Sequence, residues 1–324
     1  MYPAKVGRIQ DYGSTRVLRL HVQIEQADVP FRYEAGQWVD FMIPGLETVG
    51  GYSIISSTIS CCNEIVDNAT LPAFDLAVKK SSHPVATWIH SQHCRVNAEI
   101  SIRVGGNCTL ELLGRRHYCN IAEGNSSDRP SLPPDTTPPR QVVLIAGGIG
   151  INPLYSMLLE LSAVHYITDK RQDPPPTPAL DPPLPLTPFS SSHLSCLLIW
   201  SVRSLEDASF LLPQLVQLSR RANHLRVVLT LTLMEDECPM REEVVQHSAG
   251  EDKWGKIIVH KGRISTALLY DHLEKNRLDV VGDRTMSRSA FVCGPPGMIT
   301  AATAMLTSGE LDMRQENVYT EWWY

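Results

Sequence analysis

The stretch QVVLIAGGIGINPLYSMLLEL, residues 141–161, joins an apolar run to a glycine-rich turn and then to a helical pattern. The run at 142–146 has the length and the apolar content of a buried strand. Gly147–Asn152 follows, and apolar residues then recur at spacings of three and four, which predicts a helix. The usual dinucleotide turn is G-x-G-x-x-G, whereas here Pro153 takes the place of the last glycine. The stretch therefore predicts a strand, a turn and a helix of an α/β domain.

The turn has the chemistry of an anion site. Asn152 can cap the helix, because its side-chain oxygen accepts from exposed amides of the first turn, and Pro153 suits the first helical position. Gly147, Gly148 and Gly150 allow positive φ and a close approach of the backbone to a phosphate, which the helix N-terminus also attracts. A tight turn without a ligand is the alternative, and the complete strand, turn and helix favour the phosphate site.

Composition and charge exclude several classes of protein. The 324 residues are 43% hydrophobic and 20% charged, as in an ordinary globular protein, and the length suits two domains. The net charge of −6 and the absence of a basic stripe predict no nucleic-acid partner, and no apolar run is long enough to span a membrane. The eight cysteines form no C-x-x-C pair, which predicts reduced thiols, no metal site and an intracellular location.

Thirteen of the 23 prolines lie in two short stretches, at 130–139 and 174–188. Because proline-rich segments do not form core elements, both are expected to be exposed linkers or insertions. The second stretch predicts a disordered insertion near 170–192. The predicted parts of the chain are a β-barrel domain at 1–118, a linker at 119–140 and an α/β domain at 141–324.

The two halves differ in pattern. The first half contains short alternating runs, which predict an antiparallel β-barrel. These runs lie at 16–24, 37–43, 52–56, 74–80 and 99–106, with one helical segment at 83–92. The second half alternates strands with helices, which predicts a parallel sheet with a ligand site at the carboxyl ends of its strands. Its predicted strands are 142–146, 196–201, 225–233 and 289–293, and 206–222 predicts one unbroken helix.

Several motifs of the chain occur together in one known family. They are G-G-x-G-x-x-P at Gly147–Pro153, VRS at 202–204, C-G-P at Cys293–Pro295, GQWVDFMIPG at 36–45 and YSIISS at 52–57. With a barrel followed by a nucleotide domain, the chain resembles the ferredoxin-NADP reductase superfamily over nearly its whole length. The resemblance implies an FAD-type barrel followed by a Rossmann-like NAD-binding domain, and it makes Pro153 the ordinary end of the phosphate turn.

The resemblance also implies which residues bind the cofactors. Tyr52 would pack on the flavin, Ser53 would approach its N5 atom, and Thr87 would stand at a helix start that faces the flavin pyrophosphate. Cys293 would lie beside the nicotinamide, and a terminal aromatic side chain would stack on the flavin. Purely structural roles are the alternative for Tyr52, Thr87, Cys293 and the terminal aromatics. The further implied NAD and flavin contacts are Gly147, Gly148, Ile149, Gly150, Ile151, Asn152, Gly294, Pro295, Trp323 and Tyr324; the implied catalytic residues are Ser53 and Cys293.

One residue departs from the family pattern. That pattern is Arg-x-Tyr-Ser, and its arginine pairs with the flavin pyrophosphate, but this chain has Gly50 at that position. Loss of the charge-assisted hydrogen bond predicts weak FAD binding, and Lys79 or Lys80 on a neighbouring strand could replace the arginine. NAD is therefore the firmer of the two predicted cofactors.

The resemblance implies an oxidoreductase that transfers hydride from NADH to a flavin and then electrons to an acceptor, either a protein or a small molecule. The carboxylates of Glu235, Asp236 and Glu237 follow a predicted strand and favour NADH over NADPH, because they repel a 2′-phosphate. The alternative, which Gly50 favours, is a flavin-free NAD-binding module that acts as a sensor or interaction protein. Relatives are associated with mitochondria, although MYPAKVGRIQDYG at 1–13 shows no transit peptide.

Overall fold

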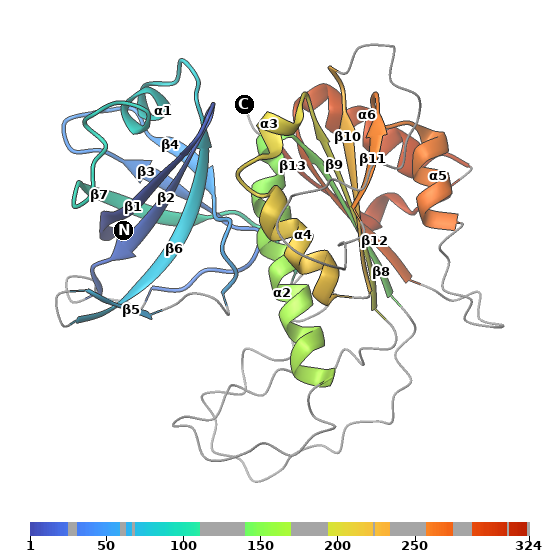
Figure 1. The fold of residues 1–324 in the computed structure, drawn as a ribbon, viewed down its shortest axis with the longest axis horizontal. Helices are drawn as coiled ribbons and strands as arrows, with labels where there is room; N and C mark the ends of the chain where they lie inside the picture. Colours follow the sequence, from blue (N-terminus) through green and yellow to red (C-terminus); the bar gives the residue numbers. More distant parts are fainter. Residues whose placement is uncertain are drawn as a thin grey trace, which may run out of the picture.

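The chain forms an antiparallel barrel and a parallel sheet with helices on both faces, which confirms the predicted fold class (Figure 1). The predicted linker and insertion lie outside the described residues, apart from Arg140, where the second sheet begins. The computed structural model describes residues 1–24, 31–58, 63–66, 69–110, 140–169, 194–222, 224–233, 257–274, 287–309 and 311–322.

The barrel consists of seven described strands in the order β4-β3-β7-β1-β2-β6-β5, and each pairs with its neighbours in antiparallel register. An isolated bridge between Ile54, which follows β4, and Leu76 of β6 closes the sheet on itself. Val39 and Phe41 alternate with partly exposed neighbours and lie fully buried in its interior. The elements are β1 (Tyr2–Tyr12), β2 (Thr15–Val22), β3 (Trp38–Met42), β4 (Gly50–Ser53), β5 (Asn63–Val66), β6 (Ala69–Lys79), helix α1 (Pro84–Ile89) and β7 (Glu99–Gly105).

The second sheet has the strand order β11-β10-β9-β8-β12-β13, and every pairing in it is parallel. Its strands are β8 (Arg140–Gly147), β9 (Leu194–Val202), β10 (Leu225–Leu231), β11 (Ile257–Lys261), β12 (Ser287–Gly294) and β13 (Val318–Trp322). Its helices are α2 (Ile151–Asp169), α3 (Leu205–Ala208), α4 (Leu212–Arg221), α5 (Thr266–Glu274) and α6 (Pro296–Leu306), with 3-10 turns η5 (Gly148–Gly150) and η8 (Gln315–Asn317). Within the described ranges, no helix is both long and apolar enough to cross a bilayer.

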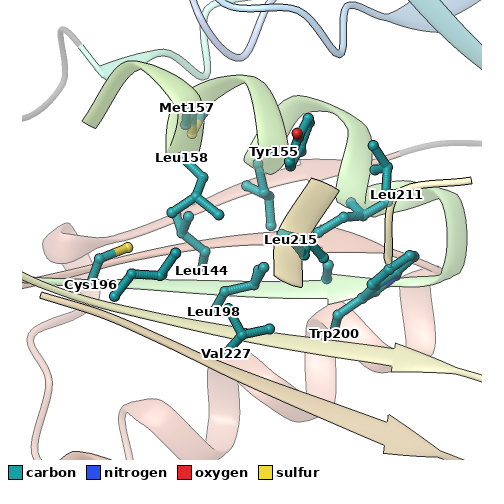
Figure 2. Close-up of a cluster of buried hydrophobic side chains, with 14 of the residues drawn as sticks. Leu144, Tyr155, Met157, Leu158, Cys196, Leu198, Trp200, Leu211, Leu215 and Val227 are labelled. Carbon is teal, nitrogen blue, oxygen red and sulfur yellow. The ribbon is translucent and has the colours of Figure 1, made fainter. Parts of the chain in front are cut away.

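Alternate residues of each central strand fill one of two cores. Leu144 and Leu198 face α2 and α4, and Figure 2 shows these side chains packed beneath the α2 residue Leu158. Val143 and Ile199 point to the opposite face, which α5 and α6 cover. Because both faces are covered, the strands are nearly continuous apolar runs, as a parallel sheet requires.

Two features of the fold were not predicted. The sequence 206–222 does not form one helix, because the chain turns between α3 and α4 and buries Phe210 against the ring of Trp200, with centroids 5.9 Å apart. Strands β1, β5, β11 and β13 also have no counterpart among the predicted runs. Charged or aromatic residues interrupt the alternation in β1 and β13, so tertiary pairing rather than local pattern makes them strands.

Helix α2 lies between the barrel and the parallel sheet (Figure 1). One stripe of this helix, at spacings of four residues, hydrogen-bonds to the barrel. Asn152 Nδ2 donates to the carbonyl of Ala77 at 2.8 Å, and Ser156 Oγ donates to the carbonyl of Ser56 at 2.6 Å. One turn further along, a hydroxyl of the barrel residue Thr58 donates to Glu160 at 3.1 Å. The sequence predicted an apolar helix face but not this polar one.

Apolar and ionic contacts complete the same interface. The barrel residues Ala35, Ile55 and Ala77 belong to the core cluster that α2 forms with the parallel sheet. Lys79 Nζ of β6 also lies 3.1 Å from a carboxylate oxygen of Asp207 in α3. These barrel residues therefore join the core on the α2 side of the parallel sheet, and α2 fixes the barrel against the carboxyl edge of the parallel strands.

We expect Ser156→Ala to lower the free energy of unfolding by about 1–3 kcal/mol. Ser156 is fully buried, and its loss leaves the buried carbonyl of Ser56 without its donor. Urea unfolding measures the change, with the exposed Ser82→Ala as the matched control. Equal unfolding midpoints for the two variants would show that this hydrogen bond contributes nothing.

Candidate functional site at the carboxyl edge of the parallel sheet

The predicted phosphate turn forms the end of β8 and the start of α2. Gly148 has φ +54°, and a Cβ built on it meets no atom within 4 Å, so this position faces open space. Its carbonyl accepts a hydrogen bond of 2.8 Å from the indole of Trp200, which holds the turn in place. Gly150 is different, since a Cβ there would lie 2.4 Å from the carbonyl oxygen of Cys293. One glycine thus leaves room for a ligand, and the other allows two strand ends to meet.

The predicted cap at Asn152 is wrong. Helix α2 begins at Ile151, one residue earlier, because the 3-10 turn runs directly into it. Asn152 and Pro153 are therefore the second and third helical residues rather than the cap and the first. The Asn152 side chain lies 3% exposed and donates across the interface to Ala77, so it is used between domains rather than on its own helix. Ile151 is buried in the shared core, and Ile149 packs against it.

Three polar side chains meet where β12 and β13 end beneath the barrel. Cys293 is buried, and it pairs in register with Glu321 of β13. Cys108, which follows β7 in the barrel domain, packs against the same core. Burial and the charge of Glu321 raise the pKa of the Cys108 thiol to about 12, so the two groups are electrostatic neighbours. None of the described cysteines forms a disulfide.

Glu321 is the functional candidate that the sequence prediction missed. Burial raises the pKa of its carboxyl from 4.5 to about 7, and its Oε2 has no hydrogen-bond partner within the described part of the chain. A carboxyl that changes protonation near neutral pH can act as a proton donor or acceptor. The only signal in the sequence was one acidic residue inside the aromatic segment YTEWWY at 319–324.

Next to this edge, the C-G-P motif forms the junction of β12 and α6. Gly294 lies against Gly147, since a Cβ on Gly294 would be 3.0 Å from Gly147 Cα. Pro295 precedes the first residue of α6. The motif therefore brings the phosphate turn and the end of β12 together, and a Cβ on Gly147 would in turn meet Met298 and Pro295.

On the barrel side, Tyr52 and Ser53 lie in β4. Ser53 is buried, and it pairs in register with Trp38. The Tyr52 ring covers Gly50, where a Cβ would approach it to 2.7 Å, and meets Phe41 edge-on at 6.1 Å between centroids. The Tyr52 hydroxyl is buried without a hydrogen-bond partner among the described residues, and this burial raises its pKa. The Tyr52 ring thus fills the space into which a side chain at position 50 would extend.

Helix α1 is short, and its predicted flavin contact, Thr87, already makes a hydrogen bond within the barrel domain. The Thr87 side chain is exposed, and its hydroxyl donates to the carbonyl of Ser81 at 3.3 Å. His83 precedes the helix without a side-chain capping bond. Arg16 holds the other end, where it donates to the carbonyl of Ile89 at 2.7 Å.

The two lysines that could replace the missing arginine are Lys79 and Lys80. Lys79 pairs with Asp207, which also accepts from Arg203 of the VRS motif at 2.9 Å. Hydrogen bonds from Arg203 and from Lys79 lower the pKa of Asp207, so this carboxylate stays ionised. Lys80 is exposed at the end of β6. The VRS motif and Lys79 therefore serve the contact between the domains.

Some predicted contacts lie outside the described residues. These are the terminal aromatics Trp323 and Tyr324 and the acidic segment 234–237 that predicts a preference for NADH. Trp322, which directly precedes Trp323, is exposed at the end of β13.

The family of this chain follows from its second sheet. The model of the ferric reductase NAD binding domain matches residues 140–305, which is just over half of the chain and runs from β8 to α6. The chain belongs to this NAD-binding family. The ferric reductase NAD binding domain of this chain thus contains the phosphate turn, VRS and the C-G-P motif.

Relatives extend the likeness to the barrel and confirm the ferredoxin reductase-like assignment. A zebrafish (Danio rerio) protein named oxidoreductase NAD-binding domain-containing protein 1 is 29% identical over 310 residues, which is 96% of this chain and 88% of that protein. The Amycolatopsis cytochrome P450 reductase GcoB matches 99% of this chain and 68% of its own, with TM-score 0.61 and 18% identity. The CS-b5R domains of human Ncb5or, solved in an NAD+ form, match 99% of this chain and 69% of their own, with TM-score 0.59 and 17% identity. The two structures show the shared fold.

We expect the pH dependence of stability to report the Glu321 carboxyl. Because its pKa is raised on folding, the folded chain keeps a proton that the unfolded chain loses between pH 4.5 and about 7. Stability should fall over this window by up to about 3 kcal/mol and level off above it. Thermal unfolding at low and neutral pH should show that Glu321→Gln removes this part of the slope.

The exposed Glu316→Gln provides the control, because it removes the same charge in the 3-10 turn η8, before β13 begins, without changing a buried carboxyl. It should keep the slope of the parent protein. A parent slope that survives in Glu321→Gln would mean that this carboxyl is solvated in the folded protein.

Proposed function

We propose that the protein is an NADH-dependent oxidoreductase that uses a loosely held flavin as its hydride acceptor. The observation that carries the proposal is the convergence of Gly148, Cys293 and Glu321 at one sheet edge, directly beneath the barrel. The NAD-binding family and the reductase-like fold support the oxidoreductase assignment. Electrons would then pass to an acceptor, either a protein or a small molecule.

The described residues suit NADH well. Gly148 leaves open space at the start of a 19-residue helix, whose first amides and positive end attract the pyrophosphate. From there the nicotinamide would reach the side chains of Cys293 and Glu321. Near neutral pH, Glu321 can donate through its protonated carboxyl or accept a proton at Oε2, and the covering barrel would exclude water.

The described residues suit a flavin less well. Gly50 supplies no cation for a pyrophosphate, the Tyr52 ring occupies the adjacent space, and Lys79 is paired with Asp207. Ser53 would remain as a polar contact at the buried end of β4. When bound, a flavin supplies the hydride-accepting ring, while the protein binds and orients it. We therefore infer a flavin that exchanges readily rather than one that stays bound.

The second candidate is a flavin-free NAD-binding module that acts as a sensor or interaction protein. The position of the Tyr52 ring over Gly50 favours it, because that ring would have to move before a side chain or a phosphate could enter. The buried carboxyl of Glu321 favours the oxidoreductase, since NAD binding alone does not require a titratable group there. The two candidates differ in one observable, which is flavin reduction by NADH.

We expect Gly148→Val to weaken NADH binding at least tenfold, which corresponds to ~1.4 kcal/mol. A valine there adds a side chain on the open, ligand-facing side of the turn and strains a backbone with φ +54°. Gly262→Val is a matched control, because Gly262 also has a positive φ and open space but lies at the end of β11. Titration calorimetry with NADH should separate them. Equal NADH affinity for both variants would leave the glycines a role in chain reversal only.

We expect Gly50→Arg to tighten flavin binding by about ten- to a hundredfold, since a charge-assisted hydrogen bond contributes roughly 1.5–3 kcal/mol. The arginine requires the Tyr52 ring to turn aside, so Gly50→Arg/Tyr52→Phe, which removes the buried hydroxyl, accompanies it. Gly51→Arg adds the same charge at an exposed neighbouring position and should have little effect. The measurements are FAD fluorescence titration and flavin bleaching under anaerobic NADH.

The flavin-bleaching result decides between the two candidate functions. Bleaching of added FAD or FMN by NADH in the parent protein, lost in Gly148→Val, supports the oxidoreductase. A folded Gly50→Arg protein that binds no FAD at saturation, together with a parent that bleaches no flavin, supports the NAD-binding module.

A further inference from the structure

Two histidines lie together on the face of the parallel sheet that is opposite to α2. His260 belongs to β11, and its neighbour at spacing two, Ile258, packs against the core cluster under α5. Because side chains alternate along a strand, His260 points to that same face. In α5, His272 lies beside the buried residues Leu269 and Leu273 and shares their inward side. A strand and a helix therefore present one imidazole each to the same place.

The two rings approach each other through the same nitrogen. His260 Nε2 and His272 Nε2 are 3.1 Å apart, and the ring planes cross at 81°. His272 is 8% exposed, whereas His260 is partly open to solvent on an edge strand. In a contact of this kind one ring must donate an N–H and the other must accept it.

A buried hydroxyl lies next to this pair. Thr230 of β10 is the register partner of His260, and it faces the same way as Val228 in the core under α5. It is fully buried, and its Oγ1 has no hydrogen-bond partner among the residues that the structure describes. Buried hydroxyls normally have a partner, which is often an ordered water. A polar ligand beside the histidines would satisfy this atom.

We propose that His260 and His272 form a binding site for a divalent transition-metal ion of the zinc, nickel or copper type. At metal–nitrogen distances of about 2.0–2.1 Å, tetrahedral geometry places two ligand nitrogens ~3.3 Å apart. The observed separation of 3.1 Å is close to this value. Because the metal lies off the line that joins the two nitrogens, both rings must also tilt so that their Nε2 lone pairs point to it. Imidazole selects these metals over calcium and magnesium, which prefer oxygen ligands.

Solvent completes this site. Across the described ranges, no group of three or more His, Cys, Asp and Glu side chains gathers in one place, so in this proposal water molecules would take the positions that the two histidines leave open. A metal-bound water is a strong donor, and Thr230 Oγ1 supplies the buried acceptor beside it. Metal binding replaces the N–H···N bond, and the ring that donated it then carries its proton on Nδ1.

The site is independent of the proposed NADH site. Strands β10, β9 and β8 separate β11 from β12 in the sheet order, and the histidines lie on the opposite face from the α2 core. Two side chains that are 12 residues apart form no recognised metal motif, so only the packing of α5 on β11 brings them together.

The test is titration calorimetry of the full, tag-free chain with Ni²⁺, chosen because the cysteines compete for zinc. We expect one Ni²⁺ per chain at this site, and a loss of affinity of at least tenfold in His260→Gln and in His272→Asn. Ni²⁺ at about five times its Kd should raise the Tm of the parent by roughly 2–4 °C and leave that of His260→Gln unchanged. His83→Asn and His93→Asn, which change exposed histidines, should bind like the parent.

The outcomes separate a metal site from a plain hydrogen bond. Equal Ni²⁺ affinity in the parent and in folded His260→Gln overturns the proposal and leaves the pair as a contact that ties α5 to β11. If His272→Asn fails to fold, His260→Gln at the partly exposed position decides alone. A tenfold loss in Thr230→Val, whose isosteric side chain lacks the hydroxyl, would support the water-mediated contact; unchanged affinity there would overturn that part.

Discussion

The arrangement of this protein depends on one helix that binds both halves of the chain. The apolar side of α2 packs on the parallel sheet, while Asn152, Ser156 and Glu160 hydrogen-bond to the barrel. These bonds form in a largely buried interface, where an unmade partner costs more than a made bond contributes. All three hydrogen bonds form together in one arrangement of the two domains, and this arrangement places the barrel over the carboxyl edge of the parallel strands.

The chemistry of that edge follows from this covering. Glu321 would be an ordinary exposed carboxylate at the end of an edge strand, but the packed domains remove water from it and raise its pKa to about 7. The same burial keeps the Cys108 thiol protonated. Open space beside Gly148, in contrast, remains where a dinucleotide phosphate would enter. The packing of the two domains thus buries one end of the candidate site and leaves its other end accessible.

The barrel shares the fold of reductase structures, and two of its residues make contacts within the chain. Tyr52 packs into the space beside Gly50, and Lys79 is directed to Asp207 in the other domain. A cation near a flavin phosphate would serve binding, whereas a cation at the domain contact serves assembly. Under the proposed oxidoreductase function, the Lys79–Asp207 pair favours a fixed domain arrangement, and the lack of a cation at Gly50 accounts for loose flavin binding.

The sequence by itself determined the two-part fold, the strand-turn-helix around Gly147–Gly150 and the family, because these depend on local spacing and alternation. It did not determine the role of Asn152, whose partner Ala77 is 75 residues away, nor the break at Phe210, which depends on the Trp200 ring. Glu321 was missed for the same reason, since its burial exists only once β13 pairs with β12 beneath the barrel. Local sequence encodes backbone conformation, whereas desolvation and long-range partners arise only when distant segments pack, and these set the charge and the contacts of the site.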